Sequence, residues 1–141
     1  MRHQKRTVKL NRNGSHRRAT FANMLKSLVE HGRLETTVPK AKELRRHADR
    51  LVTLAKKNTL ASKRAAIAKL MVSYNALSSK ETRAAKKGNT SSYNTDRKVI
   101  GKLFDELSGR YAARDGGYTR IIRKENRQGD SAPLCIIEYV Q

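Results

Sequence analysis

Apolar residues recur three and four residues apart in four stretches of the chain. This spacing is typical of one face of an α-helix. The stretches cover residues 15–32, 40–57, about 59–77 and 95–109. Pro39 lies in the first turn of the second helix, and Thr95 is a suitable N-cap for the fourth. Gly32 and Gly109 are suited to end the first and fourth helices.

The residues of each stripe are expected to face a core. They are Ala19, Ala22, Leu25 and Val29 in the first helix, Ala41, Leu44, Ala48, Leu51 and Ala55 in the second, Ile67, Leu70, Met71, Tyr74 and Leu77 in the third, and Val99, Ile100, Leu103, Phe104 and Leu107 in the fourth. Either Thr59 or Ser62 can cap the third helix.

Three shorter runs have the pattern of β-strands, at residues 33–38, 118–124 and 134–140. The last run is almost continuously apolar, as a central strand is, and it carries Cys135, which we expect to be an inert core thiol. A basic-tipped hairpin loop at residues 125–131 joins the last two runs. The expected fold is α+β, with a small sheet of about three strands, about four packed helices and a basic disordered N-terminal arm.

Residues 78–94 are polar and lack a stripe. They are basic in the middle and end in Gly, Asn, Thr and Ser. This composition predicts a loop or mobile excursion that carries at most a frayed helical turn around residues 82–87.

The charge points to a polyanionic partner. The chain has 141 residues, which fits one domain, with 32 Lys and Arg against 12 Asp and Glu, a net charge of +20. Nucleic acid is the leading candidate, a membrane surface the second and an acidic protein the third. The membrane reading is weak because no apolar run approaches the ~20 residues of a span, and because Trp is absent.

The N-terminal segment concentrates this charge. The first acidic residue is Glu30, and up to Arg12 the only apolar residues after Met1 are Val8 and Leu10. Such a segment cannot offset its ordering entropy with a core of its own, so we expect residues 1–14 to be an arm that orders on its partner. It has no apolar region of a signal peptide. A mitochondrial transit peptide would share the charge, but here the first helix continues into the expected folded domain.

Nothing in the sequence favours catalysis, a metal or a cofactor. Gly-rich phosphate loops, GxSxG and HExxH motifs are absent, and Asp105 and Glu106 are consecutive, so they point in different directions on a helix. The single cysteine and four scattered histidines make no ligand cluster. The sequence therefore predicts a binding protein, not an enzyme, with no small-molecule substrate.

The basic residues cluster in the arm, on the second helix, at residues 56–64 and 80–87, and between residues 110 and 127. Solvated surfaces normally mix both signs of charge, whereas the arm has no acid. Arg-rich arms that fold on binding are typical of RNA recognition, and the Asn, Ser and His side chains of this arm add hydrogen-bonding groups. Composition alone leaves DNA packaging open.

Several longer motifs resemble a known family. They are MRHQK at the start, LNRNGSHRRATFANMLKSLVEHGRLETTVPKAKELRRHADRLVTLAK at residues 10–56, LFDEL from Leu103, RYAARDGGYTRI at residues 110–121 and GDSAPLCIIEYV up to Val140. In this order and extent they resemble the bacterial-type ribosomal protein seventeen of the large subunit.

This resemblance implies a structural constituent of the large ribosomal subunit, located in the cytoplasm, with an α/β fold and no catalytic residues. It implies that the protein binds and stabilises large-subunit ribosomal RNA near the polypeptide exit, on the solvent side, among neighbouring ribosomal proteins. Together with the basic clusters it gives the expected RNA-binding residues: Arg2, His3, Lys5, Arg6, Lys9, Asn11, Arg12, Asn13, Ser15, His16, Arg17, Arg18, Lys40, Lys42, Arg45, Arg46, Arg110, Arg114, Tyr118 and Arg120.

The expected organisation is the arm at residues 1–14 and a single RNA-binding domain at residues 15–141. Residues 71–94 read as a polar insertion relative to the family, and their Lys-rich middle is either solvated or loosely associated with RNA. Two other classes stay in view. A nucleoid DNA-packaging protein has no reason to carry the LETTVPKAKELRR block, and an RNA-processing enzyme would need a carboxylate or nucleophile cluster.

Overall fold

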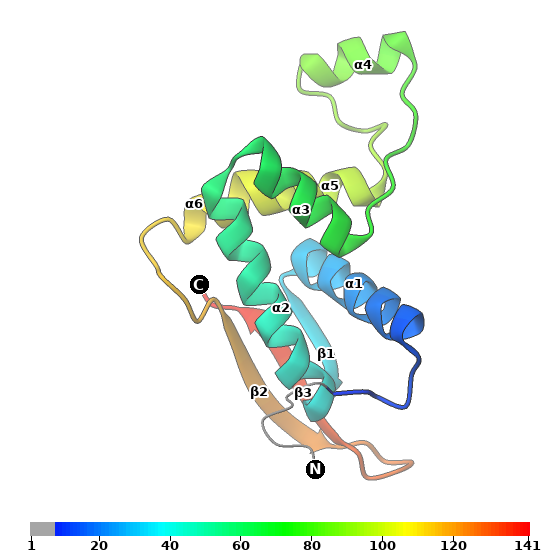
Figure 1. The fold of residues 1–141 in the computed structure, drawn as a ribbon, viewed down its shortest axis with the longest axis vertical. Helices are drawn as coiled ribbons and strands as arrows, with labels where there is room; N and C mark the ends of the chain where they lie inside the picture. Colours follow the sequence, from blue (N-terminus) through cyan, green and yellow to red (C-terminus); the bar gives the residue numbers. More distant parts are fainter. Residues whose placement is uncertain (1–7) are drawn as a thin grey trace. The chain divides into compact units, whose positions relative to one another are not determined.

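The computed structural model describes residues 8–141 (Figure 1). Its elements, in chain order, are α1 (Gly14–His31), β1 (Arg33–Thr37), α2 (Val38–Lys57), α3 (Leu60–Leu70), α4 (Ser79–Lys86), α5 (Thr95–Gly101), the π-helical η1 (Lys102–Leu107), α6 (Ser108–Arg110), β2 (Thr119–Asn126) and β3 (Pro133–Tyr139). The α5, η1 and α6 segments are continuous. The α+β class and the three-stranded sheet are confirmed.

The sheet has the order β1-β3-β2, and both pairings are antiparallel. The prediction that the last strand is central is therefore correct. Cys135 and Ile137 of β3 are fully buried and Tyr139 is nearly so, whereas the residues between them are half-buried. This alternation places every second residue of β3 in the core. The Sγ atom of Cys135 lies 3.4 Å from the carbonyl oxygen of Thr36 on β1.

The chain forms two compact units. The first consists of the described residues up to Arg50 together with Gly116–Gln141, and the second is Leu51–Asp115. Helix α2 begins in the first unit and ends in the second. These units are defined by compactness alone. The expectation that residues 15–141 act as one RNA-binding domain behind an arm stays a prediction.

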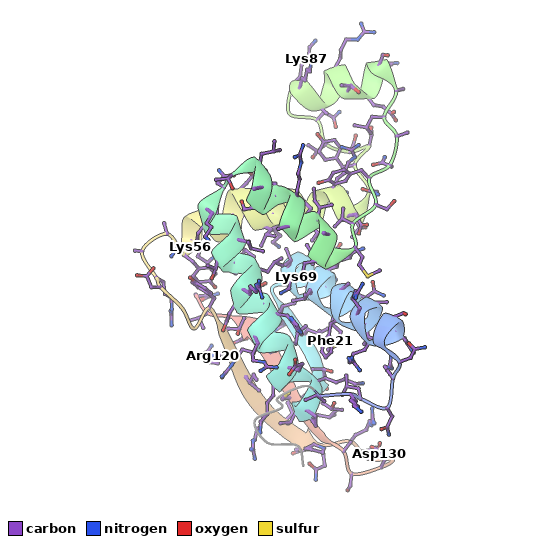
Figure 2. All side chains as sticks on the ribbon, viewed as in Figure 1. Phe21, Lys56, Lys69, Lys87, Arg120 and Asp130 are labelled. Carbon is purple, nitrogen blue, oxygen red and sulfur yellow. The ribbon has the colours of Figure 1, made fainter. Side chains whose placement is uncertain are left out.

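In the first unit, α1 and the first part of α2 pack beside each other and against the sheet. Phe21 lies on α1 (Figure 2). Its ring centroid is 5.4 Å from that of His47 on α2. The hydroxyl of Thr119 on β2 donates to Asp49 Oδ1 on α2 at 3.1 Å. The whole predicted stripe of α2 is fully buried. Helix α1 ends as predicted at Gly32, whose φ of 75° suits glycine and whose N–H donates to the Leu28 carbonyl at 2.9 Å.

The second unit contains the end of α2, α3, α4 and the α5–η1–α6 helix. Val99, Leu103, Phe104 and Leu107 are buried, as predicted. The helix is π-helical at Lys102–Leu107, and the Ser108 hydroxyl donates to the Phe104 carbonyl within it. It continues through Gly109 to Arg110, past the predicted stop. Its N-cap is Asn94, whose side chain accepts the N–H of Arg97 at 3.0 Å, and Thr95 is already the first helical residue.

The prediction for the third helix was wrong at its C-terminal end. Helix α3 stops at Leu70 because Met71 adopts a left-handed conformation with φ 51°, and the N–H of Val72 returns to the Ile67 carbonyl at 3.2 Å. Met71 and Tyr74 are consequently 50% and 43% exposed and are not core residues. At its start, Thr59 is the N-cap, and it forms a reciprocal capping box with Ser62.

The polar stretch carries more structure than predicted. Instead of a frayed turn it contains α4, a helix of eight residues with a capping box formed by Ser78 and Glu81. None of its residues is buried. Within the second unit, α4 stands away from α3 and α5 at the end of two connecting segments (Figure 1).

Candidate nucleic-acid interface

The junction between the arm and α1 has a defined geometry. Leu10 and Asn11 have positive φ angles of 54° and 49°, and the N–H of Arg12 closes a turn onto the Lys9 carbonyl at 3.2 Å. Asn13 then caps α1 by accepting the N–H of His16 at 2.8 Å. The described end of the arm therefore enters α1 through a turn and a cap.

Side-chain contacts hold this junction. The Arg12 guanidinium lies 2.7 Å from His16 Nε2 and donates to the Thr20 hydroxyl at 2.5 Å. Arg17 donates to the Arg12 carbonyl at 3.4 Å. Arg12 and Arg17 are half-buried by these contacts, while other predicted residues of the segment are exposed: Lys9, Asn11, Asn13, Ser15, His16 and Arg18. The predicted residues Arg2, His3, Lys5 and Arg6 lie outside the described residues.

The first turns of α1 and α2 contain no acidic residue. A helix N-terminus carries a partial positive charge, so nearby cations such as Arg17 and Lys40 raise the local potential instead of cancelling it. An anion is the group that such an arrangement stabilises.

The basic face of α2 lies opposite its buried stripe. Lys42, Arg45 and Arg46 are exposed and Lys40 is half-buried. Arg46 donates to both carboxylate oxygens of Glu43 at 2.8 Å, so part of its hydrogen-bonding capacity is already used. Arg45 lies one turn before Asp49. Burial raises the pKa of the Asp49 carboxyl, while the Thr119 hydroxyl and the charge of Arg45 act to lower it.

The sheet contributes less free charge than predicted. Arg120 on β2 pairs with Glu138 on β3 through Nε at 3.0 Å and Nη2 at 2.5 Å. Lys124 likewise pairs with Glu35 on β1 at 2.9 Å. Tyr118 is only 3% exposed. Its ring is a core group and cannot stack on a base in this conformation, so we leave it out of the interface.

In the second unit, the predicted residues Arg110 and Arg114 are both exposed. Arg114 belongs to the loop that follows α6. The ammonium group of Lys56 donates to the Arg114 carbonyl at 2.7 Å and to Asp115 Oδ1 at 3.2 Å, which ties this loop to the end of α2. Sequence reasoning did not select Lys56 for this role, because its contacts are 58 and 59 residues away in the chain.

One basic cluster predicted from the sequence, at residues 80–87, has a geometry that the sequence did not show. Lys80, Arg83 and Lys87 line one open hollow with Ala84, on α4 and its C-cap. Their spacing of three and four residues was visible in the sequence, but the segment was predicted to be a loop with at most a frayed turn around residues 82–87, so the spacing was not read as one side of a helix.

The described residues contain no group of three or more His, Cys, Asp or Glu side chains arranged to hold a metal ion. No helix within residues 8–141 combines the length and the apolar character that crossing a membrane requires.

The comparisons with known proteins identify the family of the chain. The model of the ribosomal protein L17 family matches residues 20–140. The chain belongs to this family. Among the similar curated proteins, that of Protochlamydia amoebophila is 64% identical, that of Chlamydia abortus 59% and that of Chlamydia trachomatis serovar L2 58%, each over 140 residues and 99% of both chains. All three are called large ribosomal subunit protein bL17.

Membership of the L17 family makes the chain a structural ribosomal protein of the large-subunit, bacterial type, located with the ribosome in the cytoplasm. The family is not one of enzymes, so the prediction that the chain has no catalytic role is confirmed. The three relatives match almost from end to end. The segment with α4 is therefore not an addition peculiar to this chain.

Proposed function

We propose that the protein binds and stabilises large-subunit ribosomal RNA through its basic arm, the start of α1 and the exposed face of α2. The observation that carries this proposal is that residues 1–29 contain no acidic residue. Within this stretch the arm leads into α1 through a turn capped by Asn13, and the basic and amide side chains around that turn are exposed. Phosphate oxygens accept hydrogen bonds from such groups, and an RNA backbone supplies the negative charge that the two helix N-termini lack.

The proposed RNA-binding residues form three groups. The arm and start of α1 contribute Arg2, His3, Lys5, Arg6, Lys9, Asn11, Arg12, Asn13, Ser15, His16, Arg17 and Arg18. Helix α2 contributes Lys40, Lys42, Arg45 and Arg46. Arg110, Arg114 and Arg120 are the third group, and Arg120 must exchange part of its contact with Glu138 to reach a phosphate.

The location follows from the family resemblance alone. On that basis the protein lies near the polypeptide exit on the solvent side, and its partners are the local ribosomal RNA and neighbouring large-subunit proteins. Site-specific crosslinking from exposed positions of α2 to RNA and protein in intact large subunits tests this. Crosslinks to the subunit interface side would contradict it.

Binding is tested by measuring affinity for large-subunit ribosomal RNA over a range of salt concentrations. Each phosphate contact releases condensed counterions, which contributes about 0.7 to 0.9 to the slope of log affinity against log salt. Arg17→Ala and Arg45→Ala should each lower the slope by about 1. Arg127→Ala is the matched control, because this exposed arginine lies in the β2–β3 hairpin and pairs with Asp130. Unchanged slopes in both variants would show that these side chains face solvent in the complex.

The competing DNA-packaging role is tested in a cell lysate separated on a sucrose gradient. A ribosomal protein sediments with large subunits and moves to the top after ribonuclease treatment. Sedimentation with DNA, or a position at the top that ribonuclease does not change, would contradict the proposal.

A further inference from the structure

The segment between α3 and α5 is closed at its base by one arginine. Arg97, on α5, donates from Nε to Asn75 Oδ1 at 3.0 Å and from Nη2 to the Asn75 carbonyl at 2.8 Å. Its guanidinium carbon lies 4.6 Å from the ring centroid of Tyr74 and 5.4 Å from that of Tyr93. One side chain thus holds both ends of the segment by a two-point hydrogen bond and by cation–π contacts.

Further bonds join the two ends of the same segment. Asn94 donates from Nδ2 to the Ser73 carbonyl at 2.7 Å and from its backbone N–H to Asn75 Oδ1 at 3.3 Å. Asn75 Nδ2 donates to the Ser92 carbonyl at 2.8 Å, and Asp96 accepts the Ser73 N–H at 2.7 Å. We call Ser73–Asn75 with Ser92–Arg97 the neck. The neck fixes the base of the segment. An unstructured linker would have no need of such a set of bonds.

The helix carried by the neck has few anionic or apolar features. Its one acid, Glu81, accepts the N–H of Ser78 at 2.8 Å in the capping box, and these bonds lower the pKa of its carboxyl. Lys80, Arg83, Lys86 and Lys87 are all exposed. The Nε of Arg83 donates to the Ser79 carbonyl at 3.2 Å, which orients its guanidinium. Figure 2 shows Lys87 at the outer end of the segment.

Three of these cations lie on one side of the helix. Lys80, Arg83 and Lys87 line the same hollow, and at 1.5 Å per residue they extend over about 10 Å of helix. A row of that length fits two or three consecutive phosphates of a nucleic-acid strand. The helix offers no aromatic or large aliphatic side chain, which a protein hot spot or a membrane-surface helix needs.

We propose that α4 and its neck form a second RNA-docking element. The row of Lys80, Arg83 and Lys87 binds phosphates of ribosomal RNA in addition to the contacts made by the arm and α2, and Arg97 is the positioning residue that orients this row. This inference rests on the proposed function and adds a separate contact to it. The solvated reading of the segment explains the charge but gives no reason for the neck.

The phosphate contacts are tested with the triple variant Lys80→Gln, Arg83→Gln and Lys87→Gln. The control removes the same charge from exposed positions of the same unit, with Lys57→Gln, Arg64→Gln and Lys98→Gln. Both are compared with the wild type by salt-dependent affinity for large-subunit ribosomal RNA and by hydroxyl-radical footprinting of the complex.

The α4 variant should lower the salt slope by about 2, from three contacts at about 0.7 each. It should also remove one separate patch of protected nucleotides and leave the remaining footprint in place. The control should keep that patch. An unchanged slope and footprint in the α4 variant would overturn the inference, whereas absence of RNA binding by the wild type would overturn the proposed function itself.

The positioning role is tested with Arg97→Gln and, as a second variant that keeps the charge of residue 97, Asn75→Ala. Each leaves Lys80, Arg83, Lys86 and Lys87 in place but removes bonds of the neck. The α4 patch should weaken and spread over more nucleotides, and amide residual dipolar couplings of α4 should change while those of α3 stay the same. Arg97→Lys should restore little, because an ammonium cannot make the two-point contact with Asn75. A sharp, unchanged patch in both variants would refute this role.

Discussion

Two helices of the second unit, α3 and α4, both begin with a capping box, but only α3 buries side chains. Thr59 and Ser62 form the capping box of α3, and Ser78 and Glu81 form that of α4. Helix α3 buries Ser62, Ala66 and Leu70, whereas α4 buries none of its residues. Removing the cap hydroxyl of each helix therefore separates the local effect of a cap from its effect on the whole fold.

Replacing an N-cap Ser or Thr by Ala costs about 1 kcal/mol. Because α3 packs into the core of the second unit, this loss lowers the free energy of unfolding of the folded protein. Thr59→Ala should therefore lower the melting temperature by about 3 °C for a chain of this size. In α4 the loss stays local. An isolated helix needs about 12–15 residues to be even marginally stable in water. With eight residues, α4 depends on its cap, and Ser78→Ala should reduce the ratio of helix to coil in α4 about fivefold, because 1.4 kcal/mol is a factor of ten.

Two measurements on the same samples distinguish these effects. Thermal unfolding followed by circular dichroism reports on the unfolding of the packed helices and the sheet. Amide chemical shifts and hydrogen exchange of residues 79–86 report on α4 alone. Ser78→Ala should leave the melting temperature within about 1 °C of the wild type and collapse the helical shifts of residues 79–86. If Ser78→Ala lowers the melting temperature as much as Thr59→Ala, then α4 is coupled to the body and the reasoning from its lack of burial fails.

Three further outcomes follow from burial and charge. Leu44→Ala, at a fully buried position of α2, should lower the free energy of unfolding by about 2–5 kcal/mol, measured by urea unfolding. The hydrogen bonds from Arg127 and from the Ala132 N–H lower the pKa of the Asp130 carboxyl to about 2, so the pair with Arg127 should support the hairpin above pH ~4 and be lost as the pH falls towards 2; an NMR titration should show this pKa rise in Arg127→Gln but stay below the ordinary value of about 4, because the Ala132 N–H still donates to the carboxyl. Burial raises the pKa of the Cys135 thiol, which should resist a thiol reagent at pH 8 in the folded protein and react once urea unfolds it; rapid labelling of the folded protein would contradict this.

The elements that could be predicted were those whose partners are set by periodicity. The stripe of α2 is fully buried in the structure, and the apolar run of β3 forms the central strand with Cys135, Ile137 and Tyr139 in the core. The end of α3 could not be predicted, because it depends on Met71 adopting the left-handed conformation, which Gly or Asn usually adopts at the end of a helix. The neck was also hidden, since Asn75 and Arg97 are 22 residues apart and their chemistry appears only when the chain turns back.

For the interface, sequence reasoning found the charge but not its pairing. The exposed basic and hydrogen-bonding side chains of the arm junction, at residues 9–18, were all selected from the sequence. Arg46 and Arg120, however, form ion pairs with Glu43 and Glu138, and Tyr118 is buried. Such losses depend on which side chains meet across strands and turns. A count of cations therefore overestimates the charge available to a partner.

The strand order has a consequence for how the protein is made. β1 and β2 each pair with β3, and β3 follows every other described element in the chain. During synthesis, α1 and α2 can form early, but the layer that covers their apolar faces is incomplete until residues 133–139 have emerged from the ribosome. Until then the growing chain presents exposed core residues and two unpaired strands beside a strongly basic leading segment, the combination that invites aggregation or premature capture by RNA. A stop codon shortly before Pro133 would therefore leave a chain without a sheet, a substrate for proteases with most of its mass already translated.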